Sequence, residues 1–241
     1  MKTELIQNRV ISIPSTTAPT VYTTLIKADD CYDYLTGVAT LAASAPTASE
    51  FKIELRDDFK SVLSFSPFNN WLKNTGSQSY NLQDCFKPLN VEARGRNFYL
   101  NVKVANCSGF DFVALLRQNV KPIVCARYDE QCFDIASPLL GSGYEITLPS
   151  DYSRCKGIMV TGGDSANAQF IGLDIYDSGG AIVDPLPFAM LTPTINTPYD
   201  NGFYPVDFES KSRQIKVRLT ALGTLPTTYT ATDFTITFLL V

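Results

Sequence analysis

The chain has 241 residues, of which 45% are apolar and 18% charged, and its formal net charge is −4. This length allows one or two domains, and the negative charge disfavours non-specific binding to nucleic acid. The chain has no histidine, which excludes a Ser-His-Asp triad and histidine metal ligands. No apolar run is long enough to cross a membrane, and the lack of an apolar core in residues 1–8 argues against secretion by the Sec route.

Taken in chain order, short segments with alternating apolar residues predict β-strands. The alternation is clearest in 97–104 and 214–219, where one face of a sheet would lie in a core. Clusters of Asp, Asn, Ser and Gly between the segments indicate turns. The predicted strands are 10–13, 21–26, 51–55, 61–65, 97–104, 111–116, 145–148, 157–161, 170–176, 181–183, 214–219 and 233–240.

Helical signals are weak. Residues 36–44 are rich in Ala and end shortly before Pro46, which predicts a short helix. Residues 129–136 predict one or two helical turns. We therefore expect very little helix in the whole chain.

One segment of the chain is repeated 117 residues later without a gap. Residues 86–102 and 203–219 both run through a turn into a predicted strand, and Arg94 of the first copy matches Lys211 of the second. Four matched positions are identical: Phe86 and Phe203, Pro88 and Pro205, Glu92 and Glu209, and Arg96 and Arg213. A period of this length is too long for a solenoid and has the size of a domain.

Weaker matches extend the repeat in both directions. Residues 53–57 match 173–177, and Pro67-Phe68 matches Pro187-Phe188, both at a shift of 120. Residues 11–15 match 146–150 at a shift of 135, and Asp111-Phe112 matches Asp233-Phe234 at a shift of 122. These shifts predict extra residues between 15 and 51 in the first half and within 223–231 in the second.

The repeat predicts two equivalent all-β domains with a boundary within 118–143, which we place so that the domains are 1–125 and 126–241. Each half shows about six strands, and further strands in 76–84 and 191–199 would bring the number near eight. Eight strands in a domain of this size are typical of a jelly roll. The predicted fold is therefore two tandem eight-stranded jelly-roll barrels.

The six cysteines form no Cys-x-x-Cys motif, so no zinc site is predicted. Without an export signal we expect free thiols that act mostly as small buried apolar residues. A disulfide between Cys125 and Cys132, or between Cys85 and Cys107, is the alternative.

Several carboxylates lie near strand ends and could form a catalytic pair or hold a cation. A glycosidase needs two carboxylates about 5–9.5 Å apart across a cleft, and Ca²⁺ needs several oxygen ligands. We favour ordinary turn residues for all of them, including the acidic turns in 162–167 and 174–180, and predict no catalytic residue, no cofactor and no metal. The residues in question are Glu54, Asp57, Asp58, Asp174 and Asp177.

Five residues are candidates for an interface between subunits. The matched cations Arg94, Arg96, Lys211 and Arg213 could pair across an interface or contact anionic lipid or a genome, although local pairs with Glu92 and Glu209 are the favoured interpretation. Trp71, the single tryptophan, could lie in the core, anchor an interface or stack on a sugar.

A short chain with two tandem jelly rolls resembles the double jelly-roll major capsid proteins of tailless icosahedral, lipid-containing phages. Its small size is most similar to those of the single-stranded-DNA phages of Flavobacterium. The resemblance implies two barrels side by side, with 86–102 and 203–219 as equivalent strands, and homotrimers of pseudo-hexameric outline that tile an icosahedral shell. The implied partners are neighbouring capsomers, penton or minor capsid proteins and an internal lipid membrane, with no sequence-specific nucleic acid. The implied location is the virion, assembled in the host cytoplasm.

Other function classes remain open. A carbohydrate-binding or adhesion module with two β-sandwich domains would use Trp71 and the Tyr-rich loops. A hydrolase of the two-jelly-roll type would need a carboxylate pair. A minor capsid or spike-base protein of the same virus class would share the fold.

Overall fold

The computed structural model describes residues 3–42, 45–74, 86–122, 129–192 and 202–241. The chain forms two compact units, the first of which ends at Asp129 while the second begins at Glu130. The domain boundary predicted between residues 125 and 126 lies outside the described residues and stays a prediction. Within the described ranges, no helix is long and apolar enough to span a membrane.

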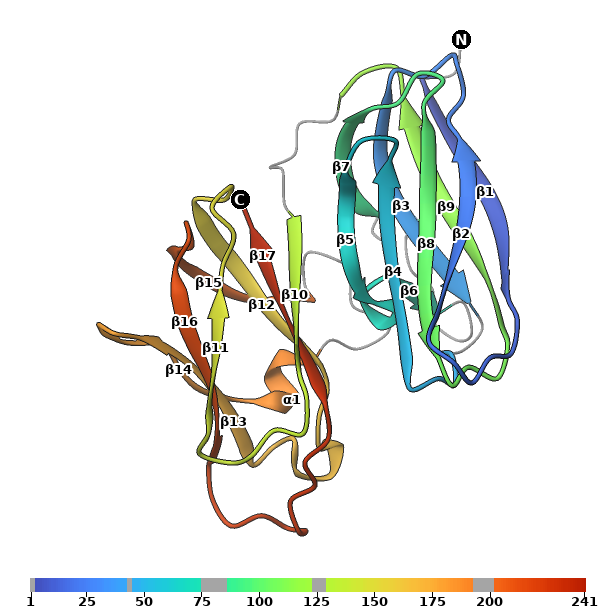
Figure 1. Cartoon of the computed structure of the whole chain (residues 1–241). Coiled ribbons are helices and arrows are strands. Elements are labelled where there is room, and N and C mark those ends of the chain that lie inside the picture. Colours follow the sequence, from blue (N-terminus) through green and yellow to red (C-terminus); the bar gives the residue numbers. More distant parts are fainter. Residues whose placement is uncertain (1–2, 43–44, 75–85, 123–128, 193–201) are drawn as a thin grey trace. The chain divides into compact units, whose positions relative to one another are not determined.

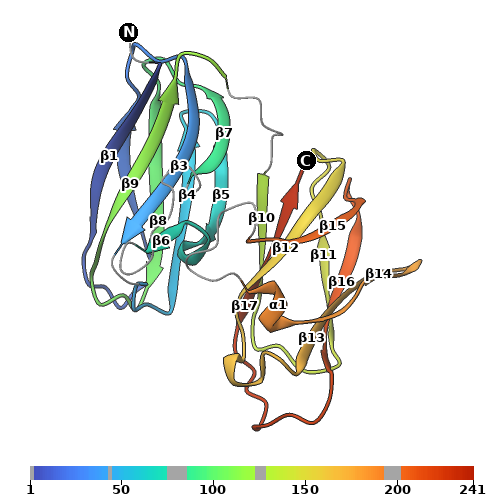
Figure 2. The ribbon, with the colours of Figure 1, turned by 180° about the vertical axis from the view of Figure 1, so that it is seen from behind.

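The first unit consists of two antiparallel sheets with one short parallel addition. One sheet has the order β1-β9-β3, with β6 and β7 both pairing with β3, and the other has the order β2-β8-β4-β5. In Figure 1 the sheet β2-β8-β4-β5 lies in front. In Figure 2, which shows the chain from behind, the sheet β1-β9-β3 lies in front. The elements are β1 (Glu4–Ile13), β2 (Thr20–Lys27), β3 (Tyr34–Ala42), β4 (Glu50–Asp57), β5 (Ser61–Pro67), the 3-10 helix η1 (Phe68–Asn70), β6 (Leu72–Asn74), β7 (Lys87–Glu92), β8 (Asn97–Ala105) and β9 (Phe110–Asn119).

The second unit has the same arrangement. Its two sheets have the orders β10-β17-β12-β15 and β11-β16-β13-β14. The elements are β10 (Asp129–Ile135), β11 (Gly143–Thr147), β12 (Arg154–Gly162), the 3-10 helix η3 (Ser165–Asn167), β13 (Ile171–Asp177), β14 (Gly180–Pro187), α1 (Phe188–Leu191), β15 (Tyr204–Glu209), β16 (Gln214–Ala221) and β17 (Phe234–Leu240).

Both units therefore have the strand order of a jelly roll. If β6 is left aside and the eight remaining strands are counted along the chain, each unit pairs strands 1-8-3-6 in one sheet and 2-7-4-5 in the other. This is the double Greek-key arrangement of a jelly roll. The prediction of two tandem eight-stranded jelly rolls is confirmed.

The cores follow from the alternation in the sequence. On β8 the inward residues Phe98, Leu100 and Val102 are fully buried, and Ile215, Val217 and Leu219 are their buried counterparts on β16. Each unit has its own apolar core between its two sheets. The predicted half-buried pattern of these two strands is confirmed.

Two helix predictions were wrong, because 36–44 falls largely in β3 and 129–136 in β10. β3 is a central strand with β9 on one side and β6 and β7 on the other, and Ala39 and Thr40 are both buried although they point to opposite faces. Burial on both faces removes the apolar–polar alternation of a half-exposed strand, so only the Ala content remained visible. The low helix content is nevertheless confirmed, since α1 is the one α-helix in the described ranges.

The match between 11–15 and 146–150 was also wrong. Ile11 lies in the first strand of its unit, whereas Ile146 lies in the second strand of its own. The counterpart of Leu148 is Ala28, because the Ala28 N–H donates to the carbonyl of Arg96 and the Leu148 N–H donates to that of Arg213. The shift from β2 to β11 is therefore 120, and the extra residues predicted within 15–51 are not present.

The other matches are confirmed. The repeated segments 86–102 and 203–219 form β7 with β8 and β15 with β16. Pro67 and Pro187 each end a strand, after which Phe68 and Phe188 begin a short helix and are buried. The second half does carry a longer connection before its last strand, at 222–233 against 106–109 in the first half. The strands predicted in 76–84 and in most of 191–199 lie outside the described residues.

Candidate functional site

The matched cations lie at equivalent turns, between β7 and β8 and between β15 and β16. The Arg96 N–H donates to the carbonyl of Ala93 over 2.8 Å, and the Arg213 N–H donates to that of Ser210 over 2.9 Å. The third residue of each turn has a positive φ, 63° at Gly95 and 50° at Ser212. The repeat has thus preserved a turn that brings two cations to one end of each unit.

In the first unit both cations pair locally. The Arg94 guanidinium lies 2.7 Å from the carboxylate of Asp33, and that of Arg96 lies 2.6 Å from Glu92. The Arg96–Glu92 pair is the local pair that the sequence predicted. Such exposed pairs contribute about 0–1 kcal/mol each, so their main effect is to orient the turn.

In the second unit Arg213 pairs with a different strand. Its guanidinium donates to the carboxylate of Asp177 over 2.6 and 2.9 Å and to the backbone carbonyl of Glu209 over 3.1 Å. This guanidinium, through its hydrogen bonds, lowers the pKa of Asp177 below its usual value. The predicted pairing with the Glu209 side chain is replaced by pairing with Asp177, and Lys211 lies exposed at the tip of the turn.

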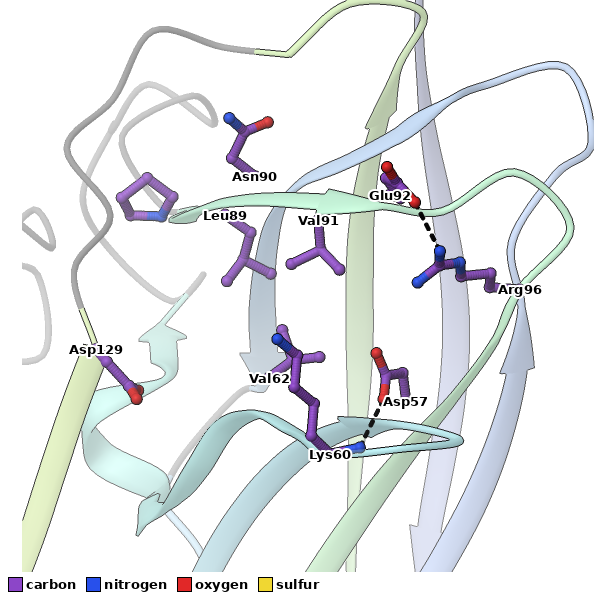
Figure 3. A pocket seen from close by; sticks show the side chains of 10 residues that line it. Asp57, Lys60, Val62, Leu89, Asn90, Val91, Glu92, Arg96 and Asp129 are labelled. Atoms are coloured by element: carbon purple, nitrogen blue, oxygen red, sulfur yellow. Dashed lines mark hydrogen bonds and ion pairs between the residues drawn. The ribbon is translucent and has the colours of Figure 1, made fainter. Parts of the chain in front are cut away.

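The two units differ at this position. Asp57 is the counterpart of Asp177, but its carboxylate accepts the N–H groups of Phe59 and Lys60 instead of an arginine. A cavity of about 270 Å³ in the first unit is lined by Asp57, Lys60, Val62, residues 88–92, Arg96 and Asp129. Figure 3 shows Arg96 paired with Glu92. The lining mixes both charges with apolar side chains and does not specify one class of ligand.

The remaining candidate carboxylates are each engaged by the protein itself. Glu54 accepts from the amide of Asn101, and Asp58 accepts from the hydroxyl of Tyr99. Asp174 is buried and accepts from the guanidinium of Arg218. Of these three, only Asp58 lies in a turn, as the sequence predicted. Glu54 and Asp174 lie within β4 and β13 and pair with residues directly opposite on the neighbouring strand, so the prediction of turn residues was wrong for these two.

Asp164, in the acidic turn 162–167, connects two loops of the second unit. Its carboxylate accepts from the Asn167 amide over 2.7 Å and from the Thr230 N–H over 3.0 Å. The hydrogen bond from Asn167 is the main cause of its lowered pKa. No group of three metal-ligating side chains is present in the part of the chain that the structure describes.

Trp71 belongs to the core of the first unit. It is 1% exposed, and its indole N–H donates to the hydroxyl of Ser66. The Lys87 ammonium lies 4.8 Å from the centre of the ring. A buried ring can neither stack on a sugar nor form a surface contact, so Trp71 is a core residue and not an interface or ligand residue.

The described cysteines are all free thiols: Cys31 is exposed, Cys132 is half-buried, and Cys107 and Cys155 are buried. Burial raises the pKa of the Cys155 thiol to about 12. Cys85 and Cys125, which the two alternative disulfides would need, lie outside the described residues.

Sequence reasoning missed an exposed apolar surface on the first unit. Val10 on β1 and Val21 and Leu25 on β2 are 67%, 52% and 51% exposed. The available signal was the uncharged sequence of 20–26, in which both alternating faces of a strand are apolar or Thr.

No family model and no curated protein matches the chain. Among solved structures, a structure of Sulfolobus Turreted Icosahedral Virus aligns with 100% of this chain and 91% of its own, at 10% identity and a TM-score of 0.49. The STIV MCP aligns over 98% and 97%, at 9% identity and a TM-score of 0.46. The major capsid protein P2 from bacteriophage PM2 aligns over 97% of both chains, at 10% identity and a TM-score of 0.38. The jelly-roll assignment rests on the strand orders of the two units.

Proposed function

We propose that this chain is a structural subunit of an icosahedral viral shell, a major capsid protein of which three copies form a capsomer of pseudo-hexameric outline. The observation that carries this function is the same jelly-roll strand order in both halves of one chain. Three copies of a two-unit chain supply six similar units. A contact between unlike surfaces that closes on itself produces a ring.

The elements that the two halves share are structural. They are the turn at 93–96 and 210–213, the buried Phe after β5 and β14, and the alternating core strands β8 and β16. The carboxylates at equivalent positions, Asp57 and Asp177, both accept the N–H group two residues further on, but only Asp177 also accepts from an arginine. Duplication has therefore preserved a shape and not a reactive group, which favours a building block over a catalyst.

The charge of the two halves favours contact between unlike units. Residues 1–129 contain 14 Lys and Arg against 12 Asp and Glu, whereas residues 130–241 contain 6 against 12. The first half is therefore slightly positive and the second clearly negative. Opposite charges favour contact of a first unit with the second unit of a neighbour, and like charges disfavour contact between two second units. A ring of alternating units follows from this preference.

The partners in this proposal are neighbouring capsomers, penton or minor capsid proteins and an internal membrane, in a virion assembled in the host cytoplasm. The structures named above include a protein described as a major capsid protein, and we extend that role to this chain only as part of this proposal.

Light scattering coupled to size-exclusion chromatography tests the assembly. We expect a species of three times the chain mass of 26.6 kDa, or larger multiples of it. A chain that stays monomeric at every concentration and salt condition would contradict the proposed function.

A further inference from the structure

The sheet orders give each unit two flanks. In the first unit β1 and β2 are the outermost strands of their sheets on one flank, and β5 and β7 lie towards the other. The side-chain amide of Gln7 on β1 donates to the carbonyl of Lys27 on β2 over 3.3 Å, so these two strands lie together. In the second unit the flank equivalent to β5 and β7 consists of β14 and β15.

The β1–β2 flank holds most of the exposed large apolar residues of the first unit, with Val21 and Leu25 on one face of β2 and Val10 on the outer face of the other sheet. Val10, Val21 and Leu25 are three of the four large apolar residues that are exposed in the described part of this unit. The fourth, Phe59, lies apart from them in the turn between β4 and β5. An outermost strand with exposed β-branched and Leu side chains promotes association unless a partner covers it.

The charges of this flank match those of β14 and β15. Besides the apolar residues, the β1–β2 flank exposes Arg9 and Lys27, of which Lys27 lies 3.9 Å from the exposed carboxylate of Asp30. The strands β14 and β15 contain no Lys or Arg, and they expose three carboxylates together with Ala181, Pro185 and Pro205. The carboxylates are Asp184, Asp207 and Glu209, of which Asp207 pairs with Arg154 and Lys156 of β12.

We propose that the β1–β2 flank of one copy docks against the β14–β15 flank of a second copy. The contact presupposes the capsomer proposed above and names the surfaces through which each copy joins the next. The exposed Val and Leu side chains provide apolar area, while Arg9 and Lys27 face the acidic strands. A charged interface of this kind selects the unlike unit as neighbour.

Two substitutions on β2 test the apolar part of the contact. V21E with L25E places two carboxylates opposite an acidic surface. We therefore expect the dissociation constant of the oligomer, measured by light scattering in a dilution series, to rise at least about 100-fold. F59E adds a charge at Phe59, an apolar residue outside the flank that is 85% exposed, and should leave the oligomer unchanged. Far-UV circular dichroism melting of each variant verifies that the monomer folds.

Charge reversal tests the identity of the partner surface. R9E with K27E, and separately D184K with E209K, should each weaken assembly at least about 10-fold at low salt. The variant with all four substitutions should assemble again, because the charges on the two surfaces are again of opposite sign. If the combined variant shows no recovery, the acidic strands are not the partner.

The outcomes separate this contact from the function itself. If the wild type forms trimers and V21E/L25E forms them equally well, the docking surface is wrong while the proposed function stands. If V21E/L25E dissociates and its combination with D184K/E209K does not restore the oligomer, another protein surface or a lipid covers the flank. That result overturns the proposed contact. A wild type that never assembles overturns the proposed function.

Discussion

Phe86 lies directly against Gly37 in the first unit, and Phe203 lies in the same way against Gly157 in the second. A Cβ atom built on Gly37 would lie 2.9 Å from the Cβ of Phe86, and one built on Gly157 would lie 2.7 Å from that of Phe203. Both glycines follow an irregularity in strand register, and each faces a proline, Pro88 or Pro205. The repeat has therefore preserved a complete packing arrangement between the third and sixth strands of each unit.

We expect Gly37→Ala and Gly157→Ala to destabilise their units by about 1–3 kcal/mol each, because the added methyl group has no room beside the Phe. Gly223→Ala is the matched control, since nothing lies within 4 Å of the added atom. Urea unfolding followed by circular dichroism measures the change. A neutral effect of both core substitutions would show that the strands move apart easily and that the contact is not a constraint.

The turn between β15 and β16 should become more stable when Ser212 is replaced by glycine. Ser212 has a φ of 50°, a region that costs an L-residue about 1 kcal/mol and costs glycine almost nothing. The reciprocal change Gly95→Ser should destabilise the first unit, because its Cβ would contact the carboxylate of Asp30. The melting temperature should therefore rise for Ser212→Gly and fall for Gly95→Ser.

Acid should selectively weaken the second unit. Asp164, Asp177 and Asp207 have lowered pKa values there, caused mainly by Asn167, Arg213 and Lys156 respectively. Unfolded Asp titrates near pH 4, so the unfolded chain binds more protons as the pH falls below that value. The stabilisation is present above about pH 4 and is lost as the pH falls through the folded pKa values.

The variant Asp177→Asn checks this account, because it keeps the shape of the side chain and removes the titrating group. The difference in melting temperature between pH 5 and pH 3 should be smaller in this variant than in the wild type. An unchanged difference would mean that the Asp177–Arg213 pair does not contribute to the pH dependence.

Among the described cysteines, alkylation should be fast only where the thiol is exposed. Iodoacetamide at pH 8 should label Cys31 in the folded protein and label Cys107 and Cys155 only after unfolding, as mapped by peptide mass spectrometry. A hydrogen bond with Asp29 raises the pKa of Cys31, so Asp29→Asn should accelerate its labelling. Rapid labelling of Cys155 in the native state would reveal frequent opening of β12.

The fold could be predicted from the sequence because the strands with the clearest apolar–polar alternation are half-buried and occur in both halves. β8 and β16 show their alternation directly, and their turns share Glu, Arg and a positive φ. β3 was missed because both of its faces are buried, and β10 was missed because it is acidic and short of apolar residues. The false match of 11–15 to 146–150 arose in the same way, since the true counterpart of β1 has little apolar pattern to align.

The candidate residues were harder to predict than the fold. Trp71 is a core residue because a neighbouring hydroxyl, on Ser66, accepts its indole N–H, and no sequence pattern indicates that contact. Arg213 pairs with Asp177, 36 positions away, because antiparallel strands bring their ends together. The β1–β2 flank was not recognised because exposure of an apolar residue depends on which strand is outermost in its sheet.

Negative-stain electron microscopy of the purified oligomer tests the central claim most directly. If three copies of a duplicated jelly roll form a capsomer, averaged images should show closed particles of six similar lobes around one centre. Isolated two-lobed particles, or open chains of varying length under all conditions, would contradict it.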